Sequence, residues 1–178
     1  MKKIIVIGLD GGSWTLLQPW INEGILPNFR KLMEKGVWGP FMSTFPPGTI
    51  PAWPAMLTGR KPEDLNAFCF ICRKKNSYKP QFNRVSYKRS IWRKLNQYNK
   101  RCYIINIPTT QLRDEKDING GFIAGPIFNI GDITNNPELQ RLIQKIDYQT
   151  SPNLRNLKET EILKTLIIHS KKQLYLVK

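Results

Sequence analysis

Apolar residues in the first quarter of the chain gather in short runs. Residues 4–7 are all β-branched, a pattern typical of a strand that is buried on both faces of a parallel sheet. Residues 14–21 and 27–35 have helical character, with a proline at the first-turn position of the second helix and Gly36 directly after it. Residues 37–44 can form another strand. The pattern predicts strand, helix, helix, strand.

The middle of the chain repeats a helix followed by a strand. Residues 90–98 form an amphipathic pattern with a serine cap, in which we expect Ile91, Trp92 and Leu95 to face inward. The apolar run 102–107 follows and is stopped by Pro108, which predicts a buried strand. Together these segments give a β-α-β rhythm.

The last third of the chain is predicted to be mainly helical. Residues 120–134 are rich in Gly, Asn and Ile, which favours a loop or lid-like excursion. Residues 136–146 and 157–177 have helical patterns, the second with an apolar stripe formed by Leu157, Ile162, Leu163, Leu166, Ile167, Leu174 and Leu176. The chain as a whole is predicted to be α/β, with a mostly parallel central sheet flanked by helices.

Composition indicates how large the fold is and which charge its partners carry. A chain of 178 residues with 40% hydrophobic content can bury one sizeable core, which predicts one globular domain. Lys and Arg number 28 against 13 acids, a net charge of +15 that favours anionic partners. The charge is densest over residues 73–101, where basic residues alternate with aromatic ones. Such interleaving can bind single-stranded nucleic acid, but because no nucleic-acid motif accompanies it, we favour a solvated basic face over a nucleic-acid partner.

Cysteine usage and the apolar runs bear on the compartment. Three cysteines are too few for a disulfide framework, which suits a reducing compartment, and the expected location is the cytoplasm. Cys69 and Cys72 form a C-x-x-C pair without the further ligands of a zinc site or the setting of a redox motif, so we interpret the spacing as chance. The apolar start is too short for a signal peptide, and nothing approaches the ~20 apolar residues of a membrane span.

Two residues are candidates for chemistry on physical grounds. Asp10 follows the first predicted strand, and ligands of open α/β sheets bind beyond the carboxyl ends of strands. Gly48 and Pro51 predict a helix that starts near Thr49 and runs to Leu57. A hydroxyl at a helix N-terminus is well placed to meet a phosphate. An ordinary threonine cap is the alternative.

Several motifs, taken in order, resemble one family. The chain is similar to the type I phosphodiesterase and nucleotide pyrophosphatase branch of the alkaline phosphatase superfamily, with the closest likeness over residues 2–126 and a helical extension over 127–178. The motifs that carry the resemblance are Asp10-Gly11-Gly12, Gly24-Ile25-Leu26-Pro27-Asn28-Phe29, the proline-flanked Thr49 ahead of Thr58-Gly59, Asn76-Ser77-Tyr78, Ile91-Trp92, and Ile105-Asn106-Ile107-Pro108-Thr109. The resemblance implies that residues 1–178 are the N-terminal part of an alkaline-phosphatase-like catalytic domain, which would be incomplete on its own.

The resemblance also implies a reaction and its cofactors. Small phosphoesters would be hydrolysed at a site with two divalent metal ions, zinc or alternatively manganese, where Asp10 is a metal ligand and Thr49 is both nucleophile and metal ligand. The family's other ligands are Asp and His residues further along, whereas this chain has a single histidine, His169, which we expect to be a helix residue rather than a ligand. Relatives also carry a His-Gly pair and a later Asp where this chain has Leu65-Asn66 and Cys69. We therefore expect weak metal binding and negligible turnover from this chain alone.

Three hypotheses stay open at this point. The first is a phosphoester hydrolase, either as a fragment of a longer enzyme or as a subunit completed by a separately encoded C-terminal half; without such a partner we expect the uncovered sheet edge and apolar faces to promote self-association. The second is a non-catalytic remnant of such an enzyme. The third is a nucleic-acid-binding protein, supported by the basic stretch 73–101.

Overall fold

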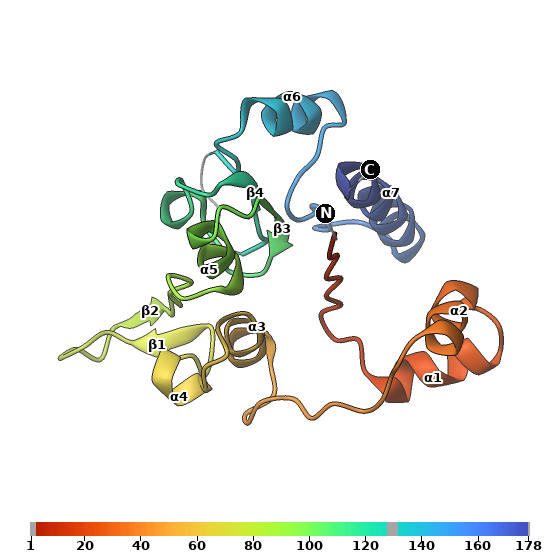
Figure 1. The fold of residues 1–178 in the computed structure, drawn as a ribbon, viewed down its shortest axis with the longest axis horizontal. Helices are drawn as coiled ribbons and strands as arrows, with labels where there is room; N and C mark the ends of the chain where they lie inside the picture. The colour runs from red at the N-terminus through yellow and green to blue at the C-terminus, as the bar shows by residue number, and fades with distance from the viewer. Residues whose placement is uncertain (1–2, 128–131, 178) are drawn as a thin grey trace. The chain divides into compact units, whose positions relative to one another are not determined.

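The computed structural model describes residues 3–127 and 132–177. The chain divides into two compact units, Met1–Ser43 and Thr44–Lys178 (Figure 1). The first unit contains the helices α1 (Trp14–Asn22) and α2 (Pro27–Lys35). The second contains α3 (Thr49–Thr58), α4 (Pro62–Leu65), β1 (Ile71–Arg73), β2 (Pro80–Phe82), α5 (Ile91–Gln97), β3 (Cys102–Ile107), the 3-10 helix η1 (Leu112–Asp114), β4 (Gly120–Ala124), α6 (Pro137–Lys145) and α7 (Glu159–Val177).

The first unit is a pair of helices joined by a short turn. Both helices lie where the sequence predicts them, and Gly36 follows α2 as its C-cap. The Trp14 indole nitrogen donates to the Gly39 carbonyl at 3.1 Å, and its ring lies 5.3 Å from that of Trp38. These contacts fold the segment after α2 back onto the start of α1.

The two strands predicted at residues 4–7 and 37–44 are wrong. Both segments lack regular secondary structure, and the side chains of Ile4, Ile5, Val6 and Ile7 are 74% to 88% exposed. A strand needs a neighbour to complete its backbone hydrogen bonds. Within residues 3–127 and 132–177 the strands pair only as β1 with β2 and β3 with β4.

The second unit is built on the parallel pair β3 and β4, which lie side by side in Figure 1. The strand 102–107 is confirmed, but the loop predicted over 120–134 is wrong for its first five residues, which form β4. The glycines that suggested a loop instead allow close approach: a Cβ on Gly125 would lie 1.6 Å from the Ile107 carbonyl oxygen. Residues 128–131 of the predicted loop lie outside the described residues.

Side chains of β3 and β4 alternate between two hydrophobic clusters, one on each face of the pair. Ile104, Phe122 and Ala124 pack with Trp92 of α5 and Leu57 of α3. On the other face Ile123 packs with residues of α6 and α7, namely Ile143 and Leu176, and with Tyr148. Helices therefore cover both faces of a parallel pair, and the predicted α/β class is confirmed.

The helices at either end of this core bury less than their sequences suggest. In α5 only Trp92 of the three expected inward residues is buried, whereas Ile91 is 58% and Leu95 41% exposed. The predicted helix is present as α7, but its apolar stripe is mostly uncovered, because Leu176 is buried while Leu163, Leu166, Ile167 and Leu174 are exposed.

Helix α6 begins as expected, with the Asn136 side chain accepting from two backbone N–H groups of the first turn. Among the described helices, none is long and apolar enough to cross a membrane.

Candidate active site

Thr49 is the first residue of helix α3, as the sequence predicts. Gly48 precedes it with φ 157° and ψ 165°, a backbone region that is essentially restricted to glycine. The Ala52 N–H donates to the Gly48 carbonyl at 3.0 Å and so closes the first turn. The helix runs to Thr58, one residue past the predicted end, and Gly59 ends it in the left-handed conformation with φ 65°.

The residue that follows Thr49 anchors the start of α3 in a hydrophobic cluster. Ile50 is only 1% exposed and lies in a cluster with Ala67 and Val85, with Leu65 packed against it. Thr49 itself is half-buried. The N-terminal end of α3 carries the positive end of the helix dipole, so an anion that approaches Thr49 is favoured there.

Asp10 lies in a turn rather than at the end of a strand. Gly11 has φ 72°, the Gly12 N–H donates to the Leu9 carbonyl at 3.2 Å, and the Ser13 N–H donates to the Gly11 carbonyl at 3.0 Å. This turn leads directly into α1 and leaves Asp10 exposed. Asp10 belongs to the first unit and Thr49 to the second, so the shared pocket that the family resemblance implies for them stays a prediction.

The side chains that could bind a metal do not gather into one centre. Over residues 3–127 and 132–177, no group of three or more His, Cys, Asp and Glu side chains is placed to hold an ion. Asp10 and Thr49 alone are too few donors for the pair of metal ions that the resemblance implies. Asp10 and Thr49 would need further ligands to hold them.

His169 and the two cysteines of the C-x-x-C pair all contact neighbouring groups of the protein. His169 stacks on Tyr148 with ring centroids 5.6 Å apart, and burial, with Lys172 nearby, lowers the pKa of His169. Cys69 Sγ donates to the Ile71 carbonyl at 2.7 Å, and Cys72 Sγ accepts from Gln81 at 3.6 Å. Both thiols are free of disulfides. His169 lies within α7, as expected.

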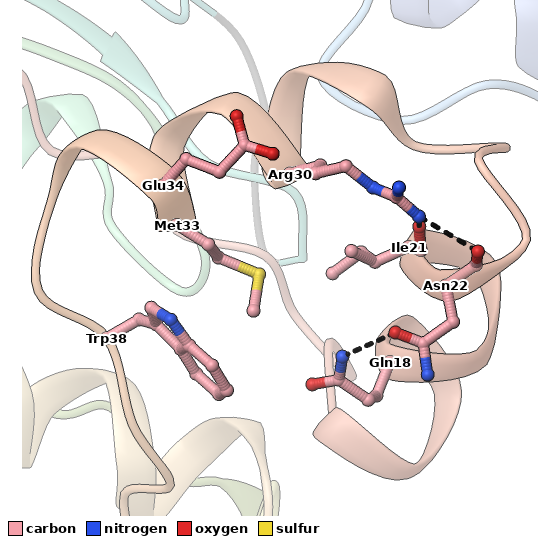
Figure 2. A pocket seen from close by; sticks show the side chains of 7 residues that line it. All are labelled: Gln18, Ile21, Asn22, Arg30, Met33, Glu34 and Trp38. Carbon is pink, nitrogen blue, oxygen red and sulfur yellow. Dashed lines mark hydrogen bonds between the residues drawn. The ribbon is translucent and has the colours of Figure 1, made fainter.

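A hollow of about 340 Å³ lies on the first unit, between α1 and α2 (Figure 2). Arg30 donates to the Ile21 carbonyl at 2.6 Å and to the Asn22 carbonyl at 2.8 Å, so its guanidinium satisfies the C-terminal end of α1. Gln18 donates to the Asn22 side chain at 3.0 Å. The hollow is a seam between two packed helices, which the Arg30 hydrogen bonds join.

Sequence reasoning missed one buried acid. Glu115 is 1% exposed and accepts from the Trp92 indole nitrogen at 3.1 Å and from Arg93 Nε at 3.2 Å, both at the same carboxylate oxygen. Burial raises the pKa of Glu115, and the two donors oppose that rise. Because Trp92 belongs to the core, Glu115 joins η1 to α5. Glu115 follows Asp114 in a polar stretch of the sequence, which gives no sign of its burial.

The fold is α/β, with helix α3 beginning at Thr49, and similarity to known sequences makes the class specific. The family model of type I phosphodiesterase / nucleotide pyrophosphatase matches residues 4–176. The chain therefore belongs to that family of phosphoester hydrolases, which act on small phosphoesters and are generally metal-dependent. No curated protein and no solved structure matches it.

Proposed function

We propose that this chain provides the nucleophile of a metal-dependent phosphoester hydrolase, with Thr49 as the attacking residue and Asp10 as one metal ligand. The observation that carries the proposal is the position of Thr49 at the first residue of α3, in a chain of the phosphodiesterase family. The helix N-terminus favours the anionic phosphate, and the packing of Ile50 keeps the turn in place.

In the covalent step the hydroxyl group of Thr49 is the nucleophile. Its Oγ1 attacks phosphorus, and as the new O–P bond forms the bond to the leaving oxygen breaks; the hydroxyl proton passes to the leaving alkoxide, or to solvent when the leaving group departs as a phenolate. Water then releases the phosphoryl group from the threonine. Two divalent ions, zinc or manganese, belong to this proposal as cofactors, with Asp10 and Thr49 among their ligands. The described donors do not by themselves form a metal centre.

The small number of proposed metal ligands also predicts how fast this chain can hydrolyse a phosphoester. With Asp10 and Thr49 as the only proposed ligands, the chain alone should bind zinc weakly, because high affinity needs several convergent ligands. Its turnover should be negligible. A non-catalytic remnant of a hydrolase is the alternative that this observation favours.

Hydrolysis of bis-p-nitrophenyl phosphate, followed in zinc or manganese, tests the proposal. We expect a rate close to that of the metal blank, with any excess release of nitrophenolate accompanied by a phosphoryl adduct that peptide mass spectrometry maps to Thr49. Thr49→Ala should abolish that excess and Thr49→Ser should retain it. Thr58→Ala at the other end of α3, where the hydroxyl donates to the Pro54 carbonyl, is the matched control.

Three results separate the alternatives. An excess that survives in Thr49→Ala would remove Thr49 from the nucleophile's role. An adduct on Thr49 whose yield is unchanged in Asp10→Asn would remove Asp10 from the proposed ligand set. A complete lack of adduct at high zinc and long incubation would favour the non-catalytic remnant.

A further inference from the structure

The positive charge of the chain is concentrated in one continuous stretch. Residues 65–113 contain no Asp or Glu, so all 13 acids lie outside the stretch. Its basic residues are Arg73, Lys74, Lys75, Lys79, Arg84, Lys88, Arg89, Arg93, Lys94, Lys100, Arg101 and Arg113. This stretch includes the hairpin formed by β1 and β2, which the proposed hydrolase chemistry does not use.

One face of the hairpin combines rings with a cation. In the antiparallel register Ile71 lies opposite Phe82 and Arg73 opposite Pro80, so these side chains share one face of the strand pair. Ile71 is 56% and Phe82 60% exposed. Tyr78, in the connecting turn, is 93% exposed, and the Arg73 guanidinium lies 5.4 Å from the centre of its ring.

The base of the hairpin is held firmly by the second unit. The Asn83 N–H donates to the Phe70 carbonyl at 2.7 Å, and the Asn83 side chain donates to the Asn66 carbonyl at 2.8 Å. Ala67 before the hairpin and Val85 after it pack in the cluster that contains Ile50. A platform that is already ordered loses less conformational entropy when it binds.

We propose that the exposed face of the β1–β2 hairpin binds single-stranded nucleic acid. Bases would stack on Tyr78 and Phe82, and the neighbouring Arg73, Lys74 and Lys75 would contact the phosphates. Stacking on aromatic rings combined with a basic track is how proteins bind single strands without sequence preference. The absence of any acid in residues 65–113 means that no like charge within this stretch opposes the polyanion.

The shape of the hairpin favours a nucleic acid over a lipid surface. A hairpin that enters a membrane interface would carry apolar residues at its tip. Here the turn after β1 carries Lys74, Lys75, Asn76 and Ser77 ahead of Tyr78, its one aromatic residue, and is closed by the Lys74 N–H donating to the Lys79 carbonyl at 3.0 Å. The Phe82 ring lies on β2, and the Tyr78 ring lies in the connecting turn with the Arg73 guanidinium over it, so stacking surface and positive charge stand together as a single strand of bases and phosphates requires. This proposal does not rest on the role of Thr49.

Fluorescence anisotropy of a labelled oligo(dT) of about 20 nucleotides, titrated with the full chain between about 50 and about 200 mM salt, tests the proposal. Charge is tested by the triple variant Arg73→Gln, Lys74→Gln, Lys75→Gln. The control triple variant Lys158→Gln, Lys164→Gln, Lys171→Gln carries the same charge change on exposed residues at and within α7. Each phosphate contact on a single strand contributes about 0.7 to the slope of log affinity against log salt, so the hairpin variant should lose about 2 from that slope. The control should lose much less.

A second pair of variants tests the stacking. Tyr78→Ala should weaken binding about tenfold, whereas Tyr78→Phe, which keeps the ring, should bind like the original chain. Because Tyr78 is almost fully exposed, neither change should affect folding, and circular dichroism checks this. Equal losses in both triple variants, or equal binding by Tyr78→Ala and Tyr78→Phe, would overturn the proposal. Cosedimentation with vesicles that contain about a third phosphatidylserine, without binding to the oligonucleotide, would instead assign the surface to membranes.

Discussion

Glu115 offers the sharpest test of how the second unit is packed. Its side chain is 1% exposed, and one carboxylate oxygen accepts from both Trp92 and Arg93. The other oxygen is buried and has no hydrogen-bond partner in the described part of the chain. The acid thus holds a core indole in place while it bears the cost of being buried as an anion.

Replacing Glu115 by alanine should lower the free energy of unfolding substantially. The Trp92 N–H would lose its acceptor in a site where Trp92 is 4% exposed, which costs about 1–3 kcal/mol. Arg93 would lose its ion-pair partner, and the total for breaking a buried pair is about 3–5 kcal/mol. At about 2–4 °C per kcal/mol for a chain of this size, the melting midpoint should fall by roughly 10 °C.

Glutamine at the same position separates the hydrogen bond from the charge. Its amide oxygen can still accept from Trp92, so the loss in Glu115→Gln should be about 1 kcal/mol. The pH dependence gives a second readout, because burial raises the pKa of Glu115 in the folded state. The folded protein then holds this proton more tightly than the unfolded chain, so stability falls as pH rises from the ordinary glutamate value, about 4.3, through the raised folded pKa. Glu115→Gln should lack that fall.

Urea unfolding followed by far-UV circular dichroism, repeated from about pH 4 to about pH 7, measures both effects. The neighbouring Asp114→Ala is the control, because its ion pair with Arg113 is exposed, at 57% and 54%, and contributes about 0–1 kcal/mol. A loss in Glu115→Ala no larger than that in Asp114→Ala would refute the proposed anchoring of Trp92. An unchanged pH profile in Glu115→Gln would refute the raised pKa.

Three further outcomes follow from the second unit. Asn136→Ala removes the side-chain cap of α6 and should cost about 1 kcal/mol in urea unfolding, while Asn136→Ser should restore most of it. Gly125→Ala should prevent normal folding, since its Cβ would lie 1.6 Å from the Ile107 carbonyl, and loss of amide protection in β3 and β4 by hydrogen exchange would show it. His169 has a lowered pKa in the folded state, so stability should fall as pH drops below the ordinary histidine value of about 6.5; a His169→Gln variant that kept the same fall would contradict this.

Features that depend on local chemistry were predictable from the sequence. Thr49 lies at a helix N-terminus because Gly48 and Pro51 set the turn, and both act through their own backbone. The same holds for Gly36 after α2 and Asn136 before α6. Family membership could also be inferred, because the motifs that carry it occur in a fixed order.

Features that depend on distant partners were not predictable in the same way. The composition of residues 4–7 is that of a strand, but a strand exists only where another backbone accepts its hydrogen bonds. In β4 the glycines suggested a loop, whereas they permit the close contact with β3. The burial of Glu115 depends on Trp92 and Arg93, more than twenty positions earlier. For the candidate site, sequence nominated Asp10 and Thr49, and their convergence would depend on two separate units.

The β-branched run at residues 4–7 makes the behaviour of the N-terminus depend on its surroundings. The side chains of Ile4 to Ile7 are mostly in water and the segment has no regular secondary structure, so its backbone can pair with an open strand edge, including one on another molecule. Protein concentration, temperature and storage time therefore become experimental variables for this chain. A charged residue at position 6 would act as a gatekeeper against such pairing and should give samples that behave the same from one preparation to the next.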